Sequence, residues 1–387
     1  MDIREDILDN LSSEEIEEGH RPLFKKFIKE FYRSANSKDF RDFDNKDLLY
    51  FAVTSFKNLQ VREKDFFKVS SYNSSKNVTI FNIANDDKPF LLDSIVIEFE
   101  NRELSIKNII HPILSISRNS DNEARDISPF SGQNNESIIQ LHCEKIYNED
   151  EVDSVTYEIR KILETCNLVV SDWPKMIDLT GKAKKNLLSC KDKFGDVNID
   201  DFIDFISWIE DGNFIFLGAT EYQVLKKDKT YSLKRVDDQI LGVLRSSYDK
   251  VVPSIYNRTA EEIKVSIEDP YFIEILKSKY TSKIHRYSYT ERIRIQKFDN
   301  DGNVCGEYRL IGLFASSAYY QPSNTIPLVR NKIKNVINRA NYAPKGHNIK
   351  DLKYVLDSYP RDELFQISEN DLCKIAMETV SISGRSV

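Results

Sequence analysis

The positions of glycine constrain this chain more than any other feature of its sequence. Only 12 glycines occur in 387 residues, which is about half the share found in ordinary soluble proteins. Neither G-x-G-x-x-G nor G-x-x-x-x-G-K-[ST] is present, although such turns are what let backbone N–H groups approach a phosphate. We therefore expect no dinucleotide-binding or P-loop domain and no bound nucleotide cofactor in this chain.

Charge and cysteine content exclude further classes of function. The 55 Lys and Arg residues stand against 62 Asp and Glu residues, a net charge of −7 with both signs interspersed, so we expect no nucleic-acid partner. Five widely spaced cysteines without a C-x-x-C motif predict reduced thiols in a cytoplasmic protein and no metal site. The acidic start of the chain and the absence of a run of about 18 apolar residues predict no membrane segment.

Residues 1–72 read as a helical N-terminal segment. Leu23, Phe24, Phe27, Ile28 and Phe31 recur at spacings of three and four, which gives one apolar stripe that must pack on another part of the protein.

Residues 73–192 read as an α+β domain. A β-branched run at 77–83 predicts a strand, and Leu92, Ile95, Val96 and Phe99 then lie on one face of a helix. Strands are predicted at 105–117 and 137–146, a second helix at 152–166 and a closing strand at 168–170. The order β-α-β-β-α-β is that of ferredoxin-like units with antiparallel sheets.

Residues 193–387 read as a second α+β domain. A helix after Asn198 is expected to end at Gly212, and a strand at 213–225 to bend at Gly218. Two strands, 291–298 and 304–314, flank a sequence ending in Asp-Gly, which is typical of a hairpin. Helical stripes follow Pro327, and the layout of residues 226–280 stays open.

One segment combines a strand end, a turn and a helix start. The free N–H groups and the dipole of a helix N-terminus favour a carboxylate ligand, so this turn is a candidate effector site; the alternative is that it starts a helix and binds nothing. Its residues are Asp86, Asp87, Lys88, Pro89, Phe90 and Leu91.

Other chemically suggestive residues have simpler interpretations. His111, His142 and Cys143 lack a third group at a spacing that would make a nucleophile pair or a metal site, and we expect structural roles for them. We assign no catalytic residue and no metal ligand.

The candidate turn and the helix after it resemble the opening of an ACT domain, whose usual form is D-R-P-G-L-L. Phe90 stands where ACT domains usually have glycine. Since a phenylalanine there would crowd a bound amino acid, the resemblance supports the ACT-like fold more than ligand binding. It also suggests that residues 193–387 form a second ACT-like domain.

A longer set of segments resembles the N-terminal part of the large NAD-specific glutamate dehydrogenases of bacteria. The segments come in that family's order and cover about 75–375. They are 88–94 (KPFLLDS), 110–113 (IHPI), 172–173 (DW), 208–218 (WIEDGNFIFLG), 241–245 (LGVLR), 298–312, 326–328 (IPL) and 359–366 (YPRDELFQ).

This resemblance implies a regulatory and assembly role. In that family the NAD-binding and catalytic portion lies far downstream, so we expect a fragment truncated before it, inactive alone, with NAD serving only the full-length parent. The expected partners are a second copy of the chain, the missing catalytic region and an amino-acid effector. The alternatives are a stand-alone ACT-type amino-acid sensor and an oligomerisation module.

Overall fold

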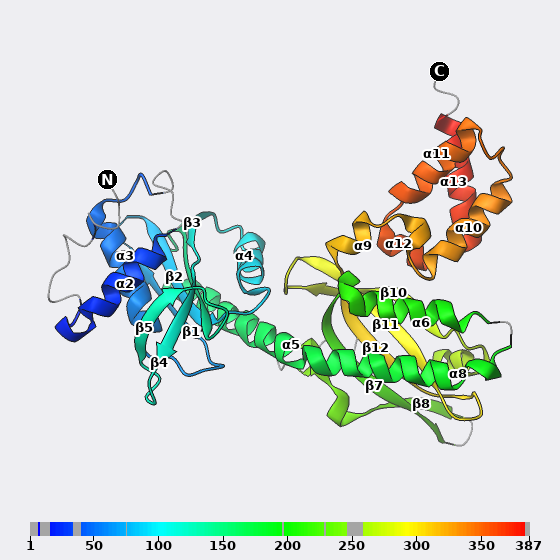
Figure 1. Ribbon diagram of the computed structural model, residues 1–387, viewed down its shortest axis with the longest axis horizontal. Helices are drawn as coiled ribbons and strands as arrows, with labels where there is room; N and C mark the ends of the chain where they lie inside the picture. Colours follow the sequence, from blue (N-terminus) through cyan, green and yellow to red (C-terminus); the bar gives the residue numbers. More distant parts are fainter. Residues whose placement is uncertain are drawn as a thin grey trace. The chain divides into compact units, whose positions relative to one another are not determined.

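The computed structural model describes residues 7, 16–33, 40–74, 76–195, 197–227, 230–245 and 258–383 (Figure 1). Residues 384–387, and parts of the region 226–280 whose layout the sequence left open, lie outside the described residues. The chain divides into two units, one of Met1–Val170 with Lys283–Tyr287 and one of Ser171–Ser282 with Ser288–Val387. The boundary therefore falls inside the long helix α5 (Glu149–Ser189).

The N-terminal segment is helical, as predicted. It contains η1 (Glu18–His20), α2 (Arg21–Phe31) and α3 (Asn45–Leu59). Asp44 caps α3 in a reciprocal capping box with Asp47. The apolar stripe of α2 is buried, with the Phe24 and Phe56 rings 5.2 Å apart, and both helices share a core with the first sheet.

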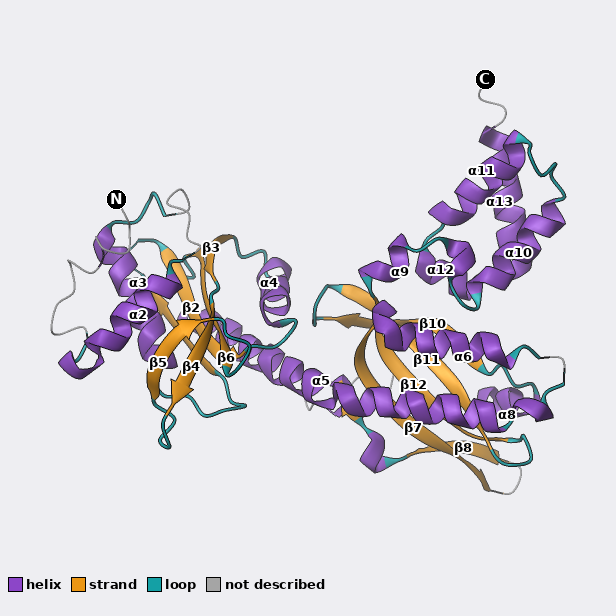
Figure 2. Cartoon of the chain, in the orientation of Figure 1, coloured by secondary structure: helices purple, strands orange, loops and turns teal. Residues whose placement is uncertain are grey.

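The first sheet is antiparallel with the strand order β1-β2-β6-β4-β5, and β3 also pairs with β6 (Figure 2). The predicted strands at 77–83 and 137–146 are its central strands, buried along almost their whole length. The predicted strand at 105–117 divides in two around His111 and Pro112. The strands are β1 (Lys68–Asn73), β2 (Val78–Asp86), β3 (Ile106–Ile110), β4 (Ile113–Arg118), β5 (Ala124–Pro129) and β6 (Asn135–Glu144).

The predicted closing strand at 168–170 is wrong, because these residues are helical. Val155, Ile159, Ile162, Cys166 and Val169 are all buried at helical spacing along α5, so the amphipathic pattern continues through the β-branched pair. The edge position beside β2 is filled instead by β1, from earlier in the chain.

The second sheet is also antiparallel, with the order β10-β11-β12-β7-β8, and β9 pairs with β7. Here β10, β11 and β12 follow one another directly, so this unit does not show the βαββαβ order expected of a second ACT-like domain. The α+β class with antiparallel sheets is confirmed. The strands are β7 (Phe214–Lys227), β8 (Thr230–Arg235), β9 (Leu241–Gly242), β10 (Ile273–Ser282), β11 (Ser288–Phe298) and β12 (Val304–Phe314).

Glycine shapes two places in this sheet as expected. Gly302 takes φ +88° in the predicted hairpin between β11 and β12, where the left-handed region favours glycine. The pairing of β12 with β7 shifts register between Ile311 and Gly312, opposite Gly218. A Cβ on Gly312 would lie 2.0 Å from the Ile215 carbonyl oxygen, so only glycine fits there.

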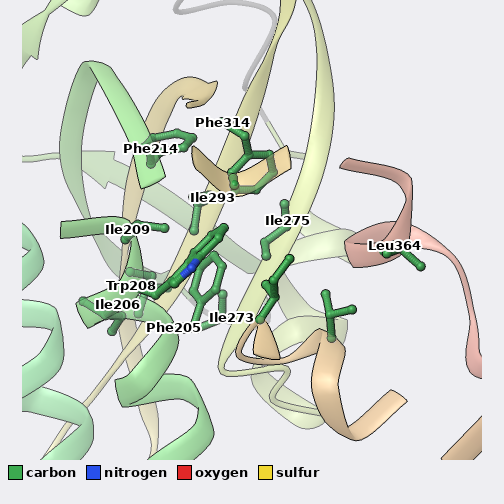
Figure 3. Packing of buried hydrophobic residues seen from close by; sticks show 14 of the residues in the cluster. Phe205, Ile206, Trp208, Ile209, Phe214, Ile273, Ile275, Ile293, Phe314 and Leu364 are labelled. Carbon is green, nitrogen blue, oxygen red and sulfur yellow. The ribbon is translucent and has the colours of Figure 1, made fainter. Parts of the chain in front are cut away.

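Aromatic side chains form much of the core of the second unit. Figure 3 shows Phe205 and Trp208 of α6 beside Ile273 and Ile293 of the sheet. The Phe314 and Phe365 rings stack at 4.9 Å. The helices are η2 (Lys191–Lys193), α6 (Ile199–Trp208), η3 (Ile209–Asn213), η4 (Asp237–Gln239), η5 (Val243–Arg245), α8 (Ala260–Glu268), α9 (Ser316–Tyr320), η6 (Ser323–Thr325), α10 (Val329–Ala340), α11 (His347–Ser358), α12 (Arg361–Gln366) and α13 (Glu369–Ser383).

Among the described helices, none combines the length and the apolar character needed to cross a membrane.

Candidate functional site

The candidate effector turn lies between the buried strand β2 and helix α4 (Leu91–Asn101). The Asp87 N–H donates to the Asn135 carbonyl at 2.9 Å, which ties the turn to β6. Leu91 is the first helical residue and is buried. The turn is therefore held on both sides by the core of the first unit.

Phe90 occupies the N-cap position of α4 with φ +75°. An L-residue in this left-handed region costs about 1–2 kcal/mol, a cost that glycine avoids. This geometry gives a physical reason for the glycine at this place in the ACT motif. No side chain caps the helix, so its N-terminal dipole is not neutralised by a capping group.

The first residue of the turn, Asp86, already has partners. Its carboxylate accepts a hydrogen bond from Arg62 Nη2 at 2.6 Å and another from the Asp65 N–H at 2.9 Å. Lys88 Nζ lies 3.9 Å from Asp65. Asp86 thus stabilises the loop before β1, a contact that no local pattern indicates because Arg62 lies 24 residues upstream.

Beside Asp86, two arginines share one buried carboxylate. Arg62 Nε donates to Glu136 at 2.8 Å, and Arg118 donates to the same carboxylate at 2.7 and 2.8 Å. Arg118 also donates to the backbone oxygens of Gln60 and Asn122. Burial alone would lower the pKa of Arg62, but Glu136 and Asp86 raise it above its usual value.

These four side chains, Arg62, Asp86, Arg118 and Glu136, are called the arginine brace below. They line a pocket of about 190 Å³. Because the guanidinium groups bind both carboxylates and several backbone oxygens, they join residues 59–66 to the ends of β2, β4 and β6. The arrangement is that of a structural link.

His111, for which a structural role was expected, lies beside the candidate turn. Its Nε2 is 2.5 Å from Ser137 Oγ. Burial lowers its pKa, although Asp87 and Asp93 act in the opposite direction. A neutral imidazole therefore stands next to two carboxylates near the start of α4.

The segment Lys283–Tyr287, which belongs to the same unit, contacts the first turns of α4. The His285 N–H donates to Ser94 Oγ at 3.0 Å, and the His285 ring lies 5.3 Å from the Phe90 ring. Lys283 Nζ lies 3.5 Å from Glu98. A ligand at the start of α4 would meet this segment, which no pattern in the sequence indicated.

The other reactive residue types lie in the core. His142 is fully buried with its pKa lowered to about 3 by burial, and burial raises the pKa of the Cys143 thiol to about 12. Neither group would be charged near neutral pH, so they do not form a nucleophile pair. Within the described ranges, no three His, Cys, Asp or Glu side chains are grouped to hold a metal ion.

Two family models match this chain. One, described as the ACT1 domain of glutamate dehydrogenase, matches residues 27–161, and the other, described as helical motif 1 of glutamate dehydrogenase, matches residues 326–385. The chain is an N-terminal region of the NAD-specific glutamate dehydrogenase family. The ACT1 match contains the candidate turn and the arginine brace, and the helical motif contains α10 to α13.

Curated relatives named NAD-specific glutamate dehydrogenase agree with this assignment. The protein of Halomonas elongata is 28% identical over 312 residues, covering 79% of this chain and 19% of the relative. The protein of Pseudomonas aeruginosa is 26% identical over 380 residues, covering 94% and 23%. The chain thus spans about a fifth of the length of these glutamate dehydrogenases.

Proposed function

We propose that this chain is a regulatory and assembly region of an NAD-dependent glutamate dehydrogenase. The parent reaction converts L-glutamate, NAD and water to 2-oxoglutarate, ammonium and NADH. The observation that carries the proposal is the ACT1 match over the first unit. In that unit the strand β2 leads through the candidate turn into helix α4, whose N-terminus has no side-chain cap. We further propose that other parts of the parent carry out hydride transfer. The glycine-poor sequence of this chain supports that division.

The proposed ligand of the turn is a free amino acid. The start of α4 suits an α-carboxylate, because the helix dipole and backbone N–H groups favour negative charge. Asp93, whose side chain is 61% exposed, and Asp87 supply negative charge for the α-ammonium group. Asp86 is not part of this proposed contact, because its carboxylate is bound to Arg62.

Calorimetric titration of the 387-residue chain with glutamate, aspartate, arginine and other amino acids tests the effector. We expect one amino acid to bind to the wild-type chain and to bind more weakly to Asp93→Asn. Lys107→Gln, a change on the exposed face of β3, is the control variant. Silence from every amino acid would remove the sensor function and leave an assembly role.

The assembly role has its own support. The first sheet ends in β1 and β5, and edge strands offer backbone groups for pairing with a second copy. Sedimentation of the chain at rising concentration should show self-association, whereas a strictly monomeric chain would contradict this part of the proposal.

The proposed division of labour is tested by activity. With L-glutamate and NAD, the purified chain should produce no NADH. Measurable NADH formation, at a rate that follows the concentration of the chain, would place chemistry in this region and overturn the proposal.

A further inference from the structure

Strand β10 forms one edge of the second sheet, since among the described strands it pairs with β11 alone. The Gln296 N–H of β11 donates to the Phe272 carbonyl at 2.8 Å, and the register places Ile273 opposite Ile295. In an antiparallel ladder, opposed residues alternate between pairs that exchange hydrogen bonds and pairs that do not. The pair of Ile273 and Ile295 is therefore of the second kind. The backbone N–H and C=O groups of Ile273 and Ile275 point away from β11.

A groove of about 570 Å³ follows this edge, and residues 273–276 of β10 line it. Successive side chains of a strand point to opposite faces of the sheet. Four consecutive residues can therefore line one groove only where the groove runs along the edge of the strand. The other walls are the start of α6, the start of α10 and the end of α12, all within the second unit.

Inside the groove, the edge of β10 offers backbone hydrogen bonds. Further along the strand, the outward N–H of Lys277 donates to Gln366 Oε1 at 3.2 Å, so α12 satisfies the edge at that point. In the described part of the chain, the outward N–H and C=O groups of Ile275 have no such partner. Outward groups on an edge strand are a template for pairing with another extended segment.

One side of the groove is apolar. Ile273 and Ile275 are buried in the core of the second unit (Figure 3). Phe202 and Phe365 are half-buried against the same core and line the groove. An apolar side chain of an added strand would pack on this side, and the side chain of its next residue would point to the other side, the side of Glu274.

The charged side chains of the groove leave an acceptor and no cationic donor. Among the described lining residues, these are Asp201, Glu274 and Lys332. Lys332 Nζ donates to three backbone carbonyls at the end of α12, and Asp201 already accepts three hydrogen bonds. Glu274 is 32% exposed and pairs with Arg294 through Oε2, so its Oε1 can accept from a cationic side chain in the groove.

We propose that this groove binds an extended segment of a partner protein, which adds to β10 as a further strand. The segment carries a lysine or arginine between two apolar residues, because alternate side chains meet the apolar side and Glu274. About four residues of the segment lie in the groove, the number that β10 contributes to it. The site lies in the second unit and does not depend on the proposed amino-acid effector or on pairing through the first sheet.

Fluorescence anisotropy of a labelled peptide, acetyl-Thr-Val-Lys-Val-Thr-amide, mixed with the 387-residue chain tests the proposal. We expect binding, and binding at least about tenfold weaker when glutamate replaces the lysine. Equal affinity for the two peptides would overturn the proposal. So would the absence of binding up to about 1 mM, whether the groove is empty or is occupied by a second copy of the chain.

Methylation of the peptide nitrogens, one at a time, distinguishes strand addition from apolar contact alone. Only every second N–H of an added strand points to β10. We therefore expect methylation to weaken binding at alternate positions and to have little effect at the positions between them. A similar effect at every position would contradict strand addition.

Two variants of α10 locate the site. Asn331 and Asn335 are both exposed, and each donates to a carboxylate, of Asp201 and Glu369 respectively; of the two, Asn331 lines the groove. Asn331→Lys should weaken binding of the lysine peptide about fivefold and should not weaken binding of the glutamate peptide. The matched control Asn335→Lys should leave both affinities unchanged. Equal weakening by the two variants, at equal melting temperatures, would place the peptide elsewhere and overturn the proposal.

Discussion

The two sheets bury arginine in different ways. In the first unit, Arg62 and Arg118 donate to Glu136 and Asp86 and to backbone oxygens, so each guanidinium is bound almost completely by the protein. In the second unit, Arg294 of β11 pairs with Glu274 of the neighbouring strand β10, and Arg309 pairs with Glu307 of its own strand, β12. Both units therefore pair buried arginines with carboxylates, but the pairs of the first unit join segments far apart in the sequence, whereas those of the second sheet lie within one strand or between neighbouring strands.

The comparison teaches that the effect of a buried arginine depends on which segments its partners belong to. A guanidinium has five N–H donors, and a buried carboxylate that takes several of them converts a potential anion site into a structural link. The brace should therefore matter more for stability than a pair within the second sheet.

The largest expected effect is that of removing the shared carboxylate. Glu136→Gln would leave two buried guanidinium groups without their common partner and should destabilise the first unit by about 3–5 kcal/mol. Both tryptophans, Trp173 and Trp208, belong to the second unit, so urea unfolding followed by circular dichroism should show an early transition that tryptophan fluorescence does not.

Asp126→Asn is the matched control for this experiment. It removes a pair in which Asp126 and Lys26 are both more than half exposed, and such pairs contribute about 0–1 kcal/mol. An equal effect of the two variants would contradict the role given to the brace.

A complementary change should damage only the second sheet. Gly312→Ala places a methyl group against the Ile215 carbonyl oxygen, which we expect to cost about 1–3 kcal/mol. Tryptophan fluorescence should now report the loss. Gly19→Ala, at a position with no atom within 4 Å of the added carbon, should leave the midpoint unchanged, and a comparable shift would argue against a steric cause.

The arginine brace and residues 168–170 show which features can be predicted from the sequence and which cannot. The β-branched run at 77–83, the helical stripe from Leu92 to Phe99 and the Asp-Gly hairpin are local patterns, and the structure contains all three. Residues 168–170 also have local β propensity, but their place in the 41-residue helix α5 follows from burial of Val169 one turn after Cys166. Polar β1, with its weak alternation, gave no strand signal.

The site residues divide in the same way. The turn at 86–91 was visible because a strand, a turn and a helix start are contiguous in sequence. The partner of Asp86 was not, because Arg62 lies 24 residues earlier in the chain and approaches Asp86 only in the folded structure. Phe90 has the positive φ that glycine favours, which accounts for the glycine that is usual at this place in the ACT motif.

The stability of the first unit should depend on pH through His142, an effect of intermediate size that the second unit does not share. His142 of the first unit has a folded pKa of about 3, below the usual value near 6.5, so the unfolded chain binds the proton more readily. The contribution of neutral His142 to the free energy of unfolding is therefore fully present above pH 6.5. It falls as the pH drops toward 3, by about 1.4 kcal/mol per pH unit in the steep range.

The measurement is urea unfolding of the first unit at several pH values between about 4 and 7, the range in which the unfolded chain takes up the proton. His142→Phe should lessen the dependence on pH, since the ring already packs 4.5 Å from Phe51. His347→Gln, an exposed change in α11, is the control, and an unchanged slope in His142→Phe would count against this assignment.

The smallest expected effect concerns the candidate turn. Phe90→Gly removes a left-handed phenylalanine, a gain of about 1–2 kcal/mol, and loses about 0.5–1 kcal/mol to glycine flexibility besides the contact with His285. The net change in unfolding free energy should stay within about 1 kcal/mol. A loss well beyond that would mean that the Phe90 ring itself holds α4 in place.

Hydrogen exchange of the 387-residue chain and of its Glu136→Gln variant tests the central comparison most directly. The account predicts faster exchange in the segments that carry Arg62, Arg118 and residue 136, with no change in β7, β11 and β12 of the second sheet. An equal loss of protection in both sheets, or no loss around the arginine brace, would contradict it.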